Sequence, residues 1–300
     1  MGRENFVFKP GLKDDGKPLI DFRTIPLRAI LKLDKLPALP TEHDANKAVG
    51  GFVDNNMFGN DQYGCCVIAA QAHDTLVFER FEQGIVIPIT RDDVINEYLR
   101  QSGGRDTGLY LTCAMKEWRK TGWEAAGKHY DIYAFASADP ADHTQIKYSI
   151  YLLNGVIFGM KVYSTDIDQF RKNEPWHLTG SNGTFEGGHG VYAYAYKTAH
   201  YDCPHCNTDW AEDCITGWAE DSLICNTWGE EQPMDWDFWN ARVNQAFAVV
   251  DNKNKWLGDS PLNIPLMESY LKEITGSSGD NPGCLCPAVG RILSKVLGVR

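Results

Sequence analysis

The sequence predicts an α+β fold in which a helical first half faces a mainly β second half across a cleft. Three segments with helical features precede residue 122, and most strand-like runs follow it. The 300 residues are 43% hydrophobic and include thirteen Phe, thirteen Tyr and nine Trp, enough to bury a large core. Separate blocks of helices and strands are typical of an α+β chain.

Each expected helix of the first half has its own signal. Apolar residues recur near helical spacing over residues 66–83, and Gly84 follows. Thr90 precedes RDDVINEYLR, which gives a second helix a plausible N-cap and an acidic first turn. A third helix is expected over residues 109–120, closed by Gly122.

In the second half of the sequence, the spacing of apolar residues changes from mainly helical to mainly strand-like. KHYDIYAFA (128–136) is expected as a strand, HTQIKYSIYLL (143–153) as a helix and GVIFGMKVY (155–163) as a buried strand. A Gly-rich loop over 180–188 then precedes the alternating run HGVYAYAYK. Two further strands are expected near 215–225 and 244–250.

The chain divides into three parts by composition. Residues 1–35 are rich in Pro and charge and are expected to form an extended arm. Residues 36–258 are the main domain, with an insertion at 198–214. Residues 259–300 are a linker and a short helix. The arm and the tail are candidate contacts for an assembly partner.

Charge and cysteine content narrow the functional class. The formal charge of −11 argues against nucleic-acid binding, which depends on clustered Lys and Arg. No apolar run approaches the roughly 20 residues that span a bilayer, and no signal peptide is seen. Nine cysteines, an odd number, favour a reducing compartment. We expect a cytoplasmic or virion-associated protein without a membrane span.

Three residues have the chemistry of a nucleophilic site. Cys66 stands where the first long helix begins, a position that favours a thiolate, and the preceding GNDQYG can offer an oxyanion its N–H groups and an amide. His189 opens a strand after a Gly pair and is the candidate base. Asn226, at the end of another strand, is suited to fix the imidazole tautomer.

The segments around these residues resemble the motifs of papain-like cysteine peptidases. GNDQYGCCVIAA resembles the family's Cys segment, HGVYAYAY its His strand and ICNTWGEE its Asn-Ser-Trp-Gly segment. They occur in the family's order, and their distances from the cysteine bracket the family's spacing of about 130 to 150 residues. The likeness covers about residues 36 to 250, and divergent bacterial and phage members are the most similar in detail.

The resemblance implies a Cys66–His189–Asn226 triad that hydrolyses peptide or protein substrates without a required cofactor. It further implies that Asn60 or Gln62 binds the oxyanion and that Trp228 shields the triad. Two departures are Val67, where the family has Trp, and Tyr63, where it has a disulfide-forming Cys. Since no long inhibitory segment precedes residue 36, zymogen control of the usual kind is not expected.

Two other functions stay open at this stage. The same triad fits an amidase or peptidoglycan hydrolase, and a fold of this kind can persist in an inactive structural or interaction protein, such as a virion component. Thiol labelling separates the enzymes from the inactive scaffold.

The insertion and His73 can each be interpreted as functional or as structural. Cysteine and histidine gather in the insertion AHYDCPHCNTDWAEDC, where Cys203, Cys206, Cys214 and His200 are candidate ligands of a structural zinc ion, and free or oxidised thiols are the alternative. His73 could be mistaken for the base, but we expect it to pack or cap on the helix surface.

Overall fold

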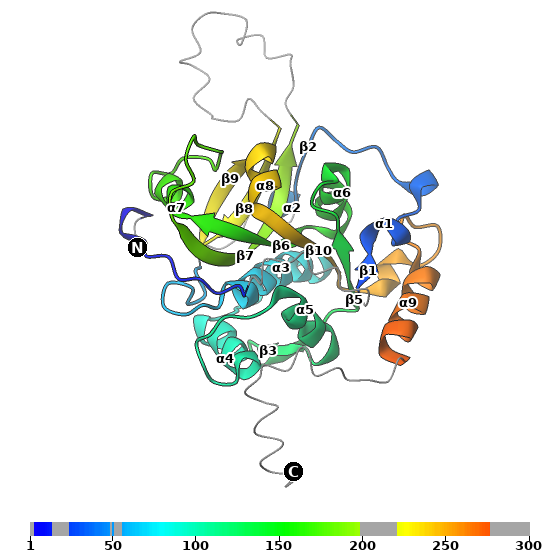
Figure 1. Cartoon of the computed structure of the whole chain (residues 1–300). Helices are drawn as coiled ribbons and strands as arrows, with labels where there is room; N and C mark the ends of the chain where they lie inside the picture. The colour runs from blue at the N-terminus through cyan, green and yellow to red at the C-terminus, as the bar shows by residue number, and fades with distance from the viewer. Residues whose placement is uncertain (1–2, 14–23, 49, 51–55, 199–220, 277–300) are drawn as a thin grey trace, which may run out of the picture.

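The structure is a computed structural model that describes residues 3–13, 24–48, 50, 56–198 and 221–276. Within these residues helices and a large sheet form an α+β fold, with the helices of the first half together on one side of the sheet, as predicted (Figure 1). None of the described helices is both long and apolar enough to cross a membrane.

Three helices build the first half: α3 (Cys66–Gln83), α4 (Arg91–Ser102) and α5 (Leu111–Lys120). The prediction of these helices is confirmed, with α5 starting two residues later than expected. At α4, Thr90 Oγ1 accepts the Asp93 N–H while the Asp93 carboxylate accepts the Thr90 N–H, a complete capping box. Gly84 ends α3 in the left-handed conformation, which glycine adopts without a Cβ clash.

The second half is an eight-stranded sheet with the path β1-β5-β10-β6-β7-β8-β9, and β2 pairs with β7. The strands are β1 (Ile25–Pro26), β2 (Glu42–Asp44), β5 (Ala134–Ala138), β6 (Val156–Tyr163), β7 (Phe185–Lys197), β8 (Ser222–Thr227), β9 (Glu230–Asp235) and β10 (Val243–Val250). Strands β6, β7, β8 and β9 pair antiparallel in succession, so residues on β7 and β8 meet directly.

The segment predicted as one strand over 128–136 is two strands. β4 (Lys128–Tyr130) forms a hairpin with β3 (Trp123–Ala125), whereas β5 belongs to the main sheet. The residues between them carry the chain from the helical half to the sheet, and a single straight strand cannot serve both.

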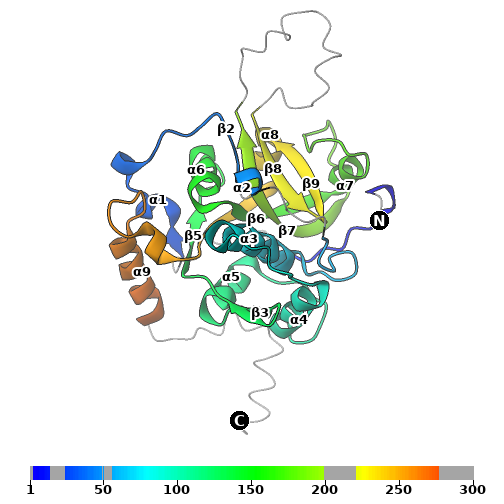
Figure 2. The same ribbon diagram turned by 180° about the vertical axis from the view of Figure 1, so that it is seen from behind.

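Smaller helices cover the sheet and its ends. They are α1 (Leu27–Ile30), α2 (Ala45–Ala48), α6 (His143–Leu153), α7 (Ser164–Arg171), α8 (Trp236–Arg242) and α9 (Ile264–Gly276), with short 3₁₀ turns at Arg3–Asn5, Leu33–Lys35 and Lys253–Trp256. Helix α3 packs against β7, as seen from behind in Figure 2, and contributes to a core with α4 and α5. A second core lies between the sheet and α1, α6 and α8.

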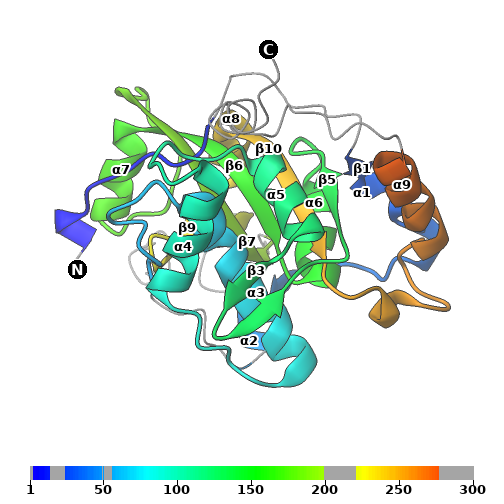
Figure 3. The same cartoon turned by 90° about the horizontal axis from the view of Figure 1, so that it is seen from below.

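Parts of both predicted terminal segments pack on the main domain. β1 pairs parallel with β5, and Ile25, Leu27 and Ile30 are buried. Helix α9, which lies in the predicted linker, rests beside α1 and buries Ile264 and Met267 (Figure 3). Residues 24–35 and 264–276 therefore share the core of the domain.

Candidate active site

Cys66 is the first residue of α3 and lies where the helical half meets the sheet. Its side chain is 1% exposed, and its Sγ accepts a hydrogen bond from the Gly190 N–H at 3.3 Å. A Cβ on Gly190 would lie 3.1–3.3 Å from three atoms of Val67, so glycine allows β7 to approach the first turn of α3 closely. The sequence thus brings the residue after His189 into contact with the thiol.

His189 lies on β7 and is also 1% exposed. Its Nε2 is 2.7 Å from Thr227 Oγ1, and its Nδ1 has no hydrogen-bond partner in the part of the chain that the structure describes. Asn226 lines the same cavity, and its Oδ1 likewise has no partner there. The imidazole therefore contacts the residue after the predicted Asn226.

Trp228 covers the imidazole. Its ring stacks on His189 with centroids 4.5 Å apart and an interplanar angle of 20°. Phe170 and Trp176 pack edge-on against the indole, which is 3% exposed. Trp228 adopts a φ of +50°, uncommon for a non-glycine residue, and this conformation turns the chain from β8 toward β9. Trp228 thus stands where a residue shielding the imidazole would stand.

The two predicted oxyanion residues lie in different surroundings. Asn60 is buried, lines the cavity beside Cys66 and donates its Nδ2 hydrogen to the Tyr63 carbonyl at 3.1 Å. Gln62 is exposed, and its side-chain oxygen accepts a hydrogen bond from Arg91. The structure brings only Asn60 to the thiol.

The cavity between these residues is small, with a volume of about 10 Å³, close to the space that one water occupies. His73 lines it as well. The prediction that His73 packs on the helix surface is wrong, because the side chain is 4% exposed and its ring centre lies 4.9 Å from that of Phe58. Burial lowers the pKa of His73 to about 3, so the ring is neutral at pH 7.

Residues 3–13, the described part of the N-terminal arm, cross the site. The arm runs from the N-terminus below β7 toward the start of α3 (Figure 1). The Leu12 N–H donates to the Gly188 carbonyl at 3.1 Å, while on the opposite wall Leu109 donates to the Gly11 carbonyl and accepts from the Lys13 N–H, both at 2.8 Å. The arm is thus held by backbone hydrogen bonds to both halves.

Close contact with glycines lets the arm reach the thiol. A Cβ on any of four wall glycines would lie 2.4–2.7 Å from an arm atom; these are Gly64, Gly108, Gly187 and Gly188. A Cβ on Gly11 would lie 2.8 Å from Cys66 Sγ. The chain's own N-terminal arm therefore covers Cys66 in this structure.

Burial sets the charges of the covered site. It raises the pKa of Cys66 to about 12, although N–H groups of Gly190, Val67 and Gly11 act in the opposite direction. It lowers the pKa of His189 to about 3. Burial thus favours the neutral thiol and the neutral imidazole in this conformation.

Comparison with known proteins identifies the fold. Xylellain, a cysteine protease from Xylella fastidiosa, matches with a TM-score of 0.56 at 16% identity, covering 84% of this chain and 97% of that one. The proCathepsin B S9 of Trypanosoma congolense matches with a TM-score of 0.55 at 13% identity, covering 81% and 86%. The fold is papain-like. No protein-family model matches the chain, and no curated protein does.

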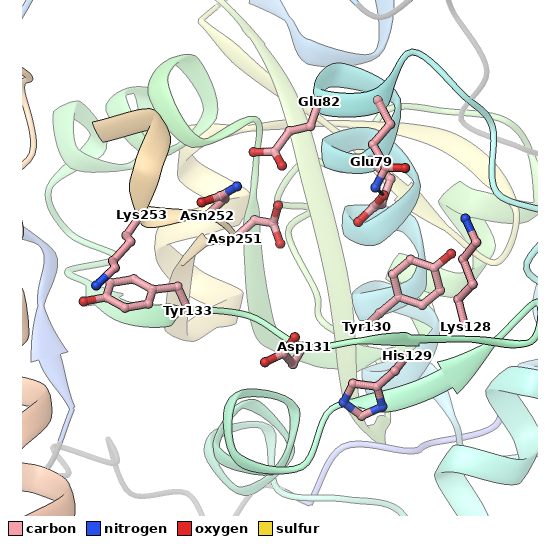
Figure 4. A pocket seen from close by; sticks show the side chains of 11 residues that line it. Glu79, Glu82, Lys128, His129, Tyr130, Asp131, Tyr133, Asp251, Asn252 and Lys253 are labelled. Atoms are coloured by element: carbon pink, nitrogen blue, oxygen red, sulfur yellow. Dashed lines mark hydrogen bonds between the residues drawn. The ribbon is translucent and has the colours of Figure 1, made fainter. Parts of the chain in front are cut away.

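A larger pocket of this papain-like domain, about 460 Å³, lies at the other end of α3. Glu79 and Glu82 of α3 line it, and Glu82 faces Asp251 across it (Figure 4). Burial, with the nearby charge of Glu82, raises the pKa of Asp251 to about 8. With a rise of about 1.5 Å per residue, roughly 20 Å of helix separates this pocket from Cys66.

The predicted zinc ligands Cys203, Cys206, Cys214 and His200 lie outside the described residues. Among the residues that are described, no group of three or more His, Cys, Asp or Glu side chains is placed to hold a metal ion. Cys65, Cys66 and Cys225 carry free, buried thiols.

Sequence reasoning missed two participants in the site. Thr227 stands between the two predicted residues Asn226 and Trp228. The signal that could have identified it is a hydroxyl side chain directly after Asn226, the expected partner of the imidazole. The arm carried a weaker signal, the single glycine in KPGLK, because its contacts with the walls are made by the backbone.

Proposed function

We propose that this chain is a cysteine peptidase in which Cys66 is the nucleophile and His189 the general base. The observation that carries the proposal is the hydrogen bond from the Gly190 N–H to Cys66 Sγ. Because Gly190 directly follows His189, this bond places the His189 backbone next to the thiol. A thiol at a helix N-terminus beside an imidazole is the arrangement that lowers a cysteine pKa once water and charge can enter.

The proposed reaction begins when the arm withdraws. Nδ1 of His189 takes the Cys66 proton, and the thiolate attacks the peptide carbonyl carbon to form a C–S bond. Asn60 Nδ2 and the Cys66 N–H are the donors we assign to the oxyanion, because both residues line the cavity. His189 then protonates the leaving amine as the C–N bond breaks, and water hydrolyses the thioester to release the acid.

The arm supports a peptide as the substrate. It lies extended in the cleft and hydrogen-bonds through its backbone to Gly188 on one wall and Leu109 on the other. Such pairing binds peptides through atoms that all of them share. This observation favours a peptidase over an amidase that recognises a sugar-linked or small amide.

The arm also opposes catalysis in the described conformation. The Gly11 N–H donates to the Gly188 carbonyl and the Gly11 carbonyl accepts from the Leu109 N–H, so backbone hydrogen bonds hold this residue against Cys66. Catalysis therefore requires its displacement. Lys9→Ala removes the arm's contact with Asp106 and is the simplest way to weaken its hold.

The test is hydrolysis of a mixture of fluorogenic and unlabelled peptides by the full chain, with products sequenced by mass spectrometry. Lys9→Ala is expected to cleave peptides faster than the wild type, and Lys9→Ala/Cys66→Ser not at all. A lack of hydrolysis by every variant, together with no epoxide labelling of Cys66, would reject the peptidase and favour an inactive scaffold.

A further inference from the structure

Asp106, on the loop between α4 and α5, is an acceptor fixed in place. Its Oδ1 accepts hydrogen bonds from the Tyr98 hydroxyl at 2.7 Å and from the Gly64 N–H at 2.9 Å. Tyr98 is fully buried and in turn accepts the Gly108 N–H at 2.9 Å. These bonds hold one carboxylate oxygen, so Oδ2 is directed outward in a fixed position.

The Lys9 ammonium meets three groups at this position. It pairs with Asp106 Oδ2, donates to the Gln62 carbonyl oxygen and lies 5.7 Å from the centre of the Tyr63 ring. A carboxylate, a carbonyl and an aromatic face together match the hydrogen-bonding and cation–π preferences of an ammonium group. The pKa of Asp106, which partial burial alone would raise, is held below its ordinary value by the hydrogen bonds from Lys9, Tyr98 and Gly64.

This ammonium site adjoins the thiol. Gly64, which binds Asp106, is two residues before Cys66, and Gly11 of the arm contacts both. Lys9 is two residues from Gly11 along the extended arm, a separation of at most about 7 Å. A side chain in this site therefore belongs to a residue within about two positions of the one that faces Cys66.

We propose that Asp106, the Gln62 carbonyl and Tyr63 form a substrate subsite for a basic side chain, which Lys9 of the chain's own arm occupies in the covered state. The proposal rests on the proposed peptidase function. It assigns the substrate class as peptides that carry Lys or Arg within two residues of the cleaved bond.

Asp106→Asn is a nearly isosteric test because Oδ1 can still accept from Tyr98 and Gly64, while the charge opposite the ammonium is lost. Asp61→Asn is the matched control, since it removes a charge from the loop that carries Gln62 without a contact to Lys9. Each substitution is made in the full Lys9→Ala chain. The substrates are neutral fluorogenic peptides in which a single Lys, or norleucine as its uncharged counterpart, is moved from position to position.

The readout is the ratio of kcat/KM for Lys to that for norleucine at each position. We expect a ratio of about 10 at one position, as charge-assisted hydrogen bonds of modest exposure provide. Asp106→Asn should reduce it to near 1, and Asp61→Asn should leave it above 5. A ratio near 1 at every position, or one unchanged by Asp106→Asn, overturns the subsite.

A binding experiment tests the subsite even if no peptide is cleaved. Fluorescein-labelled RENFVFKPGLK, the sequence of residues 3–13, and its norleucine variant at the Lys9 position are titrated into Lys9→Ala by anisotropy. The lysine peptide should bind about tenfold more tightly, with the difference lost in Lys9→Ala/Asp106→Asn. If the two peptides bind with equal affinity, or if neither binds, the subsite is overturned. If the lysine peptide binds tenfold more tightly but no peptide is hydrolysed, only the peptidase is rejected.

Discussion

Replacing Gly11 with alanine should uncover Cys66. The new Cβ would lie 2.3 Å from the Gly64 carbonyl oxygen and 2.8 Å from Cys66 Sγ, distances that side-chain rotation cannot relieve because the first is to backbone. Overpacking of this kind costs about 1–3 kcal/mol. The arm can avoid the cost by leaving the cleft, since the clash exists only while it is bound.

A cost of about 2 kcal/mol raises the population with the arm displaced about 30-fold. Since an epoxide reaches Cys66 only in that population, its labelling rate should rise by a similar factor. Intact-mass spectrometry with peptide mapping follows the adduct over time. Gly180→Ala is the matched control, because a Cβ there meets nothing within 4 Å. Labelling of Gly11→Ala at the rate of the wild type and Gly180→Ala would refute the idea that the arm protects the thiol.

Three further predictions concern the imidazole and the core. Thr227→Val removes the hydroxyl 2.7 Å from His189 Nε2 and should lower kcat about tenfold or more. If Asn226→Ala lowers kcat more than Thr227→Val does, the Asn226 amide, and not the Thr227 hydroxyl, orients the imidazole. Arg242→Met should lower the free energy of unfolding in urea by about 3–5 kcal/mol, because Asp166, 1% exposed and paired at 3.0 Å, would keep an uncompensated charge; a loss below about 1 kcal/mol would contradict this. The pKa of His189 is about 3 in the folded chain and 6.5 in its ordinary state, so between these pH values the unfolded chain binds one more proton. The free energy of unfolding should therefore fall as the pH drops from 6.5 toward 3, by up to about 1.4 kcal/mol per pH unit from this residue. Above pH 6.5 this residue should cause no change. His189→Gln should make the pH profile shallower in that interval, and identical slopes would count against a buried neutral imidazole.

Local signals in the sequence were enough to predict much of the fold. The apolar spacing over residues 66–83 with Gly84 after it, and the Thr90 cap, define α3 and α4 without reference to the rest of the molecule. The run HGVYAYAYK likewise forms a strand, β7, which the structure extends to Phe185.

The surroundings of the site depended on tertiary contacts that leave little trace in a sequence. The arm binds through backbone groups between Gly11 and partners such as Leu109, about a hundred residues away, so side-chain patterning did not indicate its path. The choice of Thr227 as the imidazole's neighbour depends on how β7 and β8 pair, and that register includes a shift between Ala193 and Ala195. His73 has an ordinary helical position, and it is buried because α3 is covered on all sides from Cys66 to Glu79.

The central claim is that Cys66 and His189 act together, and the most direct test is the pH dependence of Cys66 alkylation by iodoacetamide in Gly11→Ala. The account predicts rapid alkylation below pH 7, where an unassisted thiol with a pKa of about 8.5 reacts slowly, and loss of that rapid phase in Gly11→Ala/His189→Ala. A profile that follows an ordinary thiol and is the same with and without His189 would contradict the account.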